Sequence, residues 1–295
     1  MKALHFYGLI IFTTFLMGSS FAVVKLGLVY ASPLLLAALR FIIAGGLMAI
    51  VIAYLKQPMP KTTKEWLQIV CIGALQTAGV MGCIFLSLRT ITASESSILT
   101  FMNPLLVIIF GTLFFTQRYY TYQWVGVICG FIGVFITMGG ELKFEIGMFI
   151  GFSGAVFWAF STLLMKKWNA KINTWVLTAY QMLSGGIILL LLSFIMEKPF
   201  FITTAESIGI VLWLSILSSV VQFALWFYLL EHGEAGKTSS FLFLAPFFGV
   251  LTGALVFKDP LSWSLIAGSL FIIAGIYLVN RPRRVAPELS YERAD

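Results

Sequence analysis

The chain has 295 residues, of which 60% are hydrophobic and only 11% are charged, and its mean hydropathy is +0.98. A soluble domain is about 45–50% apolar and about 25% charged, so the composition excludes an ordinary soluble protein and predicts an all-α integral membrane protein. The net charge of +7 fits either nucleic-acid binding or the basic bias of membrane loops, and the positions of the basic residues must decide.

Apolar segments recur along the whole chain, each close to the roughly 20 residues that a helix needs to cross about 30 Å of hydrocarbon. In chain order the ten segments are 4–24, 33–54, 66–88, 94–115, 122–138, 144–165, 175–195, 208–230, 238–257 and 261–279. The first also resembles a signal peptide, but we expect it to be retained because the internal repeat described below includes it. Only short polar connectors separate the segments.

The basic residues of the connectors are distributed unevenly. Thirteen Lys and Arg residues fall in connectors on one side of the predicted membrane and four on the other. The positive-inside rule therefore places both termini in the cytoplasm, in a multi-pass protein of the cell membrane. No connector is large enough to bind nucleic acid, so the partners that we expect are the lipid bilayer and a small-molecule substrate.

An internal repeat appears when the chain is aligned with itself so that Pro104 matches Pro246. In this alignment, which we call the repeat register, Gly111 matches Gly253 and Gly133 matches Gly275. Each half holds five segments, an odd number, so the second half must enter the membrane from the opposite side. We predict inverted five-helix repeats at 4–139 and 144–281, followed by a cytoplasmic tail at 282–295. Secondary transporters often have this architecture, although other membrane proteins share it.

The matched prolines fall near the middle of their predicted helices. Proline removes a backbone donor, which leaves the carbonyls of Thr100 and Leu242 without their helical partner. Paired interruptions of this kind point to a binding site at mid-membrane and to hinges at Pro104 and Pro246. The alternative interpretation is a simple kink that neighbouring side chains satisfy.

The chain resembles the drug/metabolite transporter superfamily, and within it the ten-helix EamA-type family, over about residues 5–280. The resemblance rests on Gly18-Ser-Ser-Phe21 with Lys25, on Arg40-Phe41, and on the two proline-centred helices. Where the family usually has a glutamate thirteen residues after each proline, this chain has Gln117 and Asp259. The resemblance implies a transporter of small organic metabolites, often an exporter, without naming the substrate.

Charged residues at membrane depth normally face a cavity or a partner, and few are present. Arg40 lies about seven residues into the second predicted helix, so it is a candidate for substrate binding or gating; the alternative is an ion pair with Glu95. Lys25, at the end of the first helix, faces either the cavity or the lipid headgroups. The two positive charges and one negative charge sum to +1, which favours anionic or zwitterionic ligands.

Uncharged polar and aromatic residues inside the apolar segments form the second group of candidates. Amides in such places bind ligand or bridge helices, and aromatic rings stack on ligand or pack in the core. The amides are Gln76, Asn103, Gln181 and Gln222, and the aromatic residues are Trp158, Tyr180 and Trp226.

Enzymatic alternatives find little support. Gly151-Phe-Ser153-Gly154 matches the nucleophile motif of some intramembrane proteases, but His5 and His232 are predicted near the opposite membrane face. The three cysteines, Cys71, Cys83 and Cys129, lack metal or disulfide spacing, so no cofactor or metal is predicted.

We therefore predict a secondary transporter that works by alternating access. A channel is the main alternative, and a scramblase or a receptor is less favoured; proton coupling, direction and oligomeric state stay open.

Overall fold

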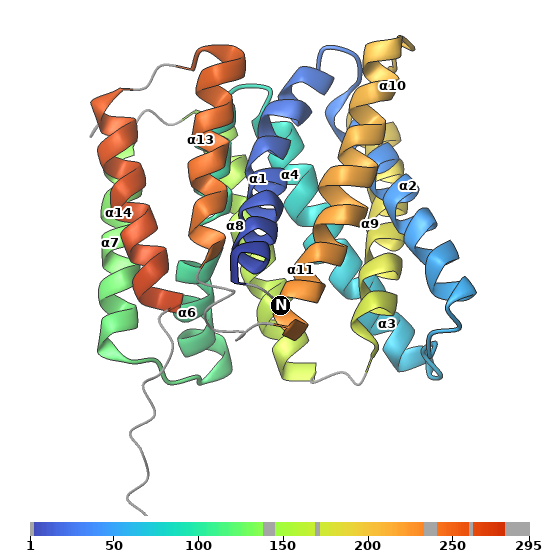
Figure 1. Ribbon diagram of the computed structural model, residues 1–295, viewed down its shortest axis with the longest axis horizontal. Helices are drawn as coiled ribbons and strands as arrows, with labels where there is room; N and C mark the ends of the chain where they lie inside the picture. The colour runs from blue at the N-terminus through green and yellow to red at the C-terminus, as the bar shows by residue number, and fades with distance from the viewer. Residues whose placement is uncertain (1–2, 138–144, 169–171, 233–240, 260–261, 281–295) are drawn as a thin grey trace, which may run out of the picture.

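The computed structural model describes residues 3–137, 145–168, 172–232, 241–259 and 262–280. In these ranges the chain is helical, apart from an isolated antiparallel β-bridge between Ala31 and Phe201. The helices stand side by side in one bundle (Figure 1). The predicted boundary between the repeats, at 139–144, and the predicted tail, 282–295, lie outside the described residues.

The first half contains two interrupted helices. A π-helix, η1, joins α3 to α4 without a break, and a turn at Phe101 and Met102 separates α5 from α6. The elements are α1 Ala3–Gly27, α2 Pro33–Tyr54, α3 Thr63–Ile72, η1 Gly73–Gly79, α4 Val80–Ser87, α5 Ala93–Thr100, α6 Asn103–Phe115 and α7 Thr121–Thr137.

The second half has similar interruptions. A second π-helix, η2, joins α10 to α11, and a short 3₁₀-helix, η3, precedes α13. The elements are α8 Ile146–Trp168, α9 Thr174–Met196, α10 Ala205–Leu212, η2 Trp213–Val221, α11 Gln222–His232, η3 Phe241–Phe243, α13 Leu244–Phe257 and α14 Trp263–Asn280.

Seven helical stretches in the described residues are long and apolar enough to cross a membrane, and α13 and α14 are shorter apolar helices. The seven are His5–Gly27, Pro33–Tyr54, Thr63–Ser87, Ala93–Phe115, Ile146–Trp168, Thr174–Met196 and Ala205–Leu229. The prediction of an all-helical membrane protein is thus confirmed at this level.

The local backbone repeats between the halves in the same register as the sequence. In the repeat register η1 falls on 215–221, which lies within η2. The residues that follow α6 and α13, Thr116 and Lys258, also match each other, and both have a left-handed backbone, with φ of 51° and 55°. The interruptions are therefore features of the repeated unit rather than accidents of one half.

A contact between a lysine and an aromatic ring also occurs twice. Lys25, at the end of α1, lies 5.5 Å from the ring centre of Phe257 at the end of α13. Lys167, near the end of α8, lies 5.6 Å from the ring centre of Phe115 at the end of α6. The repeat register matches Lys25 with Lys167 and Phe115 with Phe257, so the halves hold each other through the same contact, made once in each direction.

Helices α2 and α9 are antiparallel and cross closely at small residues. A Cβ atom on Gly45 would lie 2.6 Å from the backbone nitrogen of Leu183, and one on Gly186 would lie 2.9 Å from that of Ile42. Glycine permits this approach because it has no side chain. The packing directs Arg40 of α2 and Gln181 of α9 toward the middle of the bundle, where both are buried.

Helices α7 and α14 pack against each other in the same way, which gives a direct test of the fold. A Cβ atom on Gly133 would lie 2.7 Å from the carbonyl oxygen of Gly268 and 2.8 Å from the backbone nitrogen of Ile272. We expect Gly133→Leu to cost at least about 1–3 kcal/mol, because backbone atoms would have to move. Thermal unfolding in detergent measures this loss. Gly46→Leu is the control, since a Cβ atom on Gly46 meets nothing within 4 Å.

Candidate functional site

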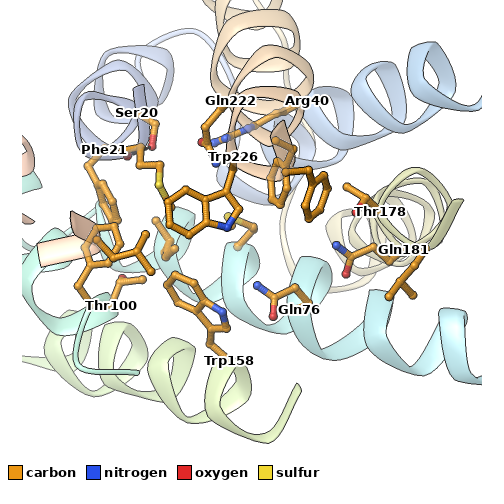
Figure 2. A pocket seen from close by; sticks show the side chains of 18 of the residues that line it. Ser20, Phe21, Arg40, Gln76, Thr100, Trp158, Thr178, Gln181, Gln222 and Trp226 are labelled. Atoms are coloured by element: carbon orange, nitrogen blue, oxygen red, sulfur yellow. Dashed lines mark hydrogen bonds between the residues drawn. The ribbon is translucent and has the colours of Figure 1, made fainter. Parts of the chain in front are cut away.

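A cavity of about 280 Å³ lies in the middle of the bundle and is lined by both halves (Figure 2). Most of its lining is apolar. The polar lining residues are Ser20 of α1, Arg40 of α2, Gln76 of η1, Thr100 of α5, Thr174, Thr178 and Gln181 of α9, and Gln222 of α11. A few polar groups in an apolar enclosure are typical of a small-molecule site.

Pro104 lies near the middle of the apolar helical stretch Ala93–Phe115, just after the turn that divides this stretch into α5 and α6. Pro104 occupies the first turn of α6, and Pro246 is the third residue of α13. Proline is tolerated there because the first turn of a helix needs no internal donor. In the first half the interruption is therefore a break between α5 and α6 rather than a kink within one helix. Thr100 and Leu242, whose carbonyls lose their helical donor, both line the cavity.

Arg40 is buried, with 4% of its surface exposed, and lines the cavity. Its Nε donates to Ser219 Oγ at 2.9 Å, and its Nη2 donates to Ser218 O at 2.8 Å and to Ser218 Oγ at 3.2 Å. These serines belong to η2, so Arg40 joins the two halves. In the described part of the chain its hydrogen bonds go to no carboxylate. An unpaired buried charge is costly, and an anionic group in the cavity would compensate it.

Glu95 is not the partner of Arg40. Its Oε2 accepts hydrogen bonds from Thr92 N at 2.8 Å and from Thr92 Oγ1 at 2.9 Å, and Glu95 N donates in return to Thr92 Oγ1 at 3.1 Å. This reciprocal arrangement caps the start of α5. The carboxylate is therefore occupied by its own helix.

Three further candidates lie outside the lining of this cavity. Lys25 donates to the carbonyl oxygen of Ile91 at 2.9 Å. Asn103 is buried at the start of α6, and its Nδ2 has no hydrogen-bond partner among the described residues. Tyr180 packs edge-on against Trp66, with ring centres 5.0 Å apart.

The other predicted residues come together. Gln76, Gln181, Gln222, Trp158 and Trp226 line the cavity, and Figure 2 shows the two indoles entering it from opposite sides. The Oε1 atoms of Gln76 and Gln181 are buried and have no hydrogen-bond partner among the described residues. An unpartnered buried polar atom costs about 1–3 kcal/mol, which a hydrogen-bonding ligand would recover.

The residues that replace the family glutamate join helix ends instead of lining the cavity. Gln117 Oε1 accepts hydrogen bonds from Tyr119 Oη at 2.8 Å and from Lys166 Nζ at 3.0 Å. Asp259 Oδ2 accepts one from Ser94 Oγ at 3.1 Å. Both positions therefore hold the end of a helix against a neighbouring element.

Several residues of the site were missed by sequence reasoning. Ser218 and Ser219 hold Arg40, and Ser20, Thr174 and Thr178 line the cavity. The repeat contained a usable signal, because Ser218 corresponds to Gln76 in the repeat register. Serine and threonine in a membrane helix otherwise attract little notice, since their hydroxyls can bond to their own helix.

The central cavity adjoins a second cavity toward one end of the bundle. The second cavity, of about 1100 Å³, shares Thr174 and Phe227 with the central one. Its remaining lining residues come from the loop that follows α2, from the start of α3, from the loop before α9 and from the start of α9: Pro58, Met59, Pro60, Lys61, Glu65, Ile172, Asn173 and Trp175. We call this end the open end. At the other end, which we call the closed end, α1 leads into α2.

These features define a multi-pass membrane protein with an internal, partly polar cavity between two similar halves. A family model described as the EamA-like transporter family matches residues 6–139 and 145–281, and the chain belongs to this family.

The chain is 29% identical to the uncharacterized transporter YvbV of Bacillus subtilis, over 92% of this chain and 90% of that protein. It is 25% identical to a chloroplast WAT1-related protein of Arabidopsis thaliana, over 91% and 67% of the two chains. Protein PecM of Dickeya dadantii is also 25% identical, over 86% and 87%. A solved crystal structure with 21% identity matches with a TM-score of 0.67, over 92% of this chain and 96% of that one, so the fold is shared.

The family and these relatives confirm the predicted class: the protein is a multi-pass transporter of the cell membrane. Transporters of this kind act on small molecules and are generally not enzymes.

Proposed function

We propose that the protein is a secondary transporter that exports small organic molecules by alternating access. It has ten membrane helices in two inverted five-helix repeats, residues 4–139 and 144–281, with both termini in the cytoplasm. The antiparallel α2 and α9, and the lysine contacts made once in each direction, support two units of opposite orientation. Inverted units can exchange conformations and so expose one site to each side in turn.

The substrate in this proposal is an anionic or zwitterionic metabolite, such as an amino-acid-like compound or a drug of that charge. The observation that carries it is the burial of Arg40 beside the cavity without a carboxylate partner in the described residues. Arg40 binds the anionic group, the amides of Gln76, Gln181 and Gln222 orient the molecule, and Trp158 and Trp226 stack on its apolar part.

A channel is less well supported, because a channel needs a pathway open at both ends at once, whereas among the described residues the central cavity adjoins a second cavity at one end. The proposal has a direct test in two stages. Extracellular metabolites of cells that overexpress the protein are compared with those of cells that lack it, which identifies substrates without guessing them.

Purified protein in liposomes is then given the substrates that emerge. We expect saturable flux that unlabelled substrate on the far side accelerates. Flux far above carrier rates without this acceleration would show a channel, and movement of lipids without any soluble metabolite would contradict the proposal.

A further inference from the structure

The closed end is joined by backbone hydrogen bonds between two loops. Ala31, in the loop between α1 and α2, forms an antiparallel bridge with Phe201, in the loop between α9 and α10. Ser32 N donates to Phe200 O at 3.1 Å, and Ile202 N donates to Tyr30 O at 2.7 Å. The two loops therefore form a short strand pair that covers this end of the α2–α9 pair.

The counterpart of Ala31 at the open end follows from the helix caps. Ser32 is the N-cap residue of α2, and Asn173 is the N-cap residue of α9, which is the corresponding helix of the second half. The residue before each cap is Ala31 in one case and Ile172 in the other. Ile172 therefore takes the place of Ala31.

The counterpart of Phe201 follows in the same way. Thr62 and Thr204 are the N-cap residues of α3 and α10, and each accepts a hydrogen bond from the backbone three residues ahead. Three residues before these caps lie Met59 and Phe201. Met59 and Ile172 both line the 1100 Å³ cavity. The loops that meet at the closed end thus have counterparts that border the opening at the other end.

A carboxylate holds the closed end together. Glu197, directly after α9, accepts hydrogen bonds from Leu35 N at 3.0 Å, from Leu34 N at 3.3 Å and from Ser193 Oγ at 2.7 Å. The hydroxyl of Ser32 makes no cap hydrogen bond to α2. The first donors of α2 consequently depend on a carboxylate from another helix, which is favourable beside a helix N-terminus.

The open end has no such carboxylate at the equivalent position. Seven residues before Thr204 lies Glu197, and seven residues before Thr62 lies Leu55, which cannot accept a hydrogen bond through its side chain. Helix α9 is instead capped by its own Asn173, whose Oδ1 accepts from Trp175 N at 2.9 Å and from Val176 N at 3.3 Å. Opening the closed end would leave α2 uncapped, whereas α9 carries its cap whichever end is open.

We propose that segments 30–32 and 200–202 form one gate of the transport cycle, and segments 57–59 and 172–174 form the other. Glu197 is a positioning residue that keeps the first gate closed in the resting protein. The two gates alternate, because each combines one loop from each half, and the two halves exchange the kinds of loop that they contribute. This inference rests on the proposed function insofar as alternating access requires two gates.

Paired cysteines test both gates in a chain whose Cys71, Cys83 and Cys129 are replaced with alanine. Residues opposite each other in an antiparallel bridge have Cα atoms about 4.5–5.5 Å apart, which suits a disulfide. We expect Ala31→Cys with Phe201→Cys to cross-link readily in resting membranes, to stop transport, and to recover on reduction. The matched pair, Met59→Cys with Ile172→Cys, should cross-link at least about tenfold more slowly.

Variants of Glu197 test the asymmetry. Glu197→Ala should shift the equilibrium between the gates about tenfold, which corresponds to about 1.4 kcal/mol: the 31–201 pair then cross-links more slowly and the 59–172 pair more quickly. Glu197→Gln keeps the size of the side chain and one acceptor oxygen, so we expect an intermediate shift. This variant replaces Glu197→Ala in the test if the alanine variant fails to fold. Glu206→Ala, which removes an exposed glutamate from the first turn of α10, should change neither rate.

Cross-linking needs no substrate, so its outcome is separate from that of the flux assay. Equal rates for the two pairs, unchanged rates in both Glu197 variants, or normal transport with the 31–201 disulfide formed would each overturn the gate. Absence of flux for every metabolite tested, with the expected cross-linking pattern, would instead contradict the proposed transport function.

Discussion

Arg40→Ala should abolish transport while the protein is still inserted into the membrane. The guanidinium is buried beside the cavity, and in the described residues it donates hydrogen bonds to Ser218 and Ser219 and to no carboxylate, so its charge is available to an anionic substrate. Hydrogen bonds to charged groups contribute about 1.5–3 kcal/mol, and each 1.4 kcal/mol is about tenfold in affinity. We therefore expect KM to rise by at least about tenfold, or flux to disappear, in liposomes that contain equal amounts of protein.

Two variants separate binding from general damage. Arg40→Lys keeps the charge but cannot reproduce the planar fork that reaches Ser218 and Ser219 together, so partial transport is expected. Arg89→Ala removes an exposed arginine from the loop before α5 and should transport normally. Unchanged KM and rate in Arg40→Ala would remove this residue from the site.

The features that the sequence predicted well depend on a single segment, or on a comparison of that segment with the matching segment of the other half. Apolar runs set the helices, because the membrane leaves the backbone few other structures. Pro104 marked the interruption between α5 and α6, and Thr100 beside this interruption lines the cavity. Arg40, Gln76 and Gln181 stood out because polar residues at membrane depth are rare.

The features that could not be predicted depend on contacts between the halves. No sequence pattern marked Glu197, because its partners, Leu34 and Leu35, belong to the other half of the chain. Glu95 looked like an ion-pair partner for Arg40, but the local capping arrangement with Thr92 competes for the same carboxylate. A single sequence shows which charged residues are present, but not which residues distant in the sequence they contact.

Gln181→Leu distinguishes a ligand-binding amide from one that joins helices. Gln181 is buried and lines the cavity, and its Oε1 has no hydrogen-bond partner among the described residues. Leucine is similar in size and apolar, so the substitution removes an unsatisfied group rather than a bond. We expect thermal stability in detergent to stay the same or to rise, while KM rises about tenfold because the substrate loses a hydrogen bond of about 1–1.5 kcal/mol.

Gln123 provides the control, because both polar atoms of its amide make hydrogen bonds within the protein. Gln123 Nε2 donates to Val279 O of α14 at 3.1 Å, and its Oε1 accepts from Tyr120 N at 2.9 Å. Gln123→Leu should therefore lower the unfolding temperature and leave KM unchanged. If Gln181→Leu instead behaved like Gln123→Leu, the amide of Gln181 would be structural, and recognition in the cavity would depend on Arg40, the other two amides and the aromatic residues.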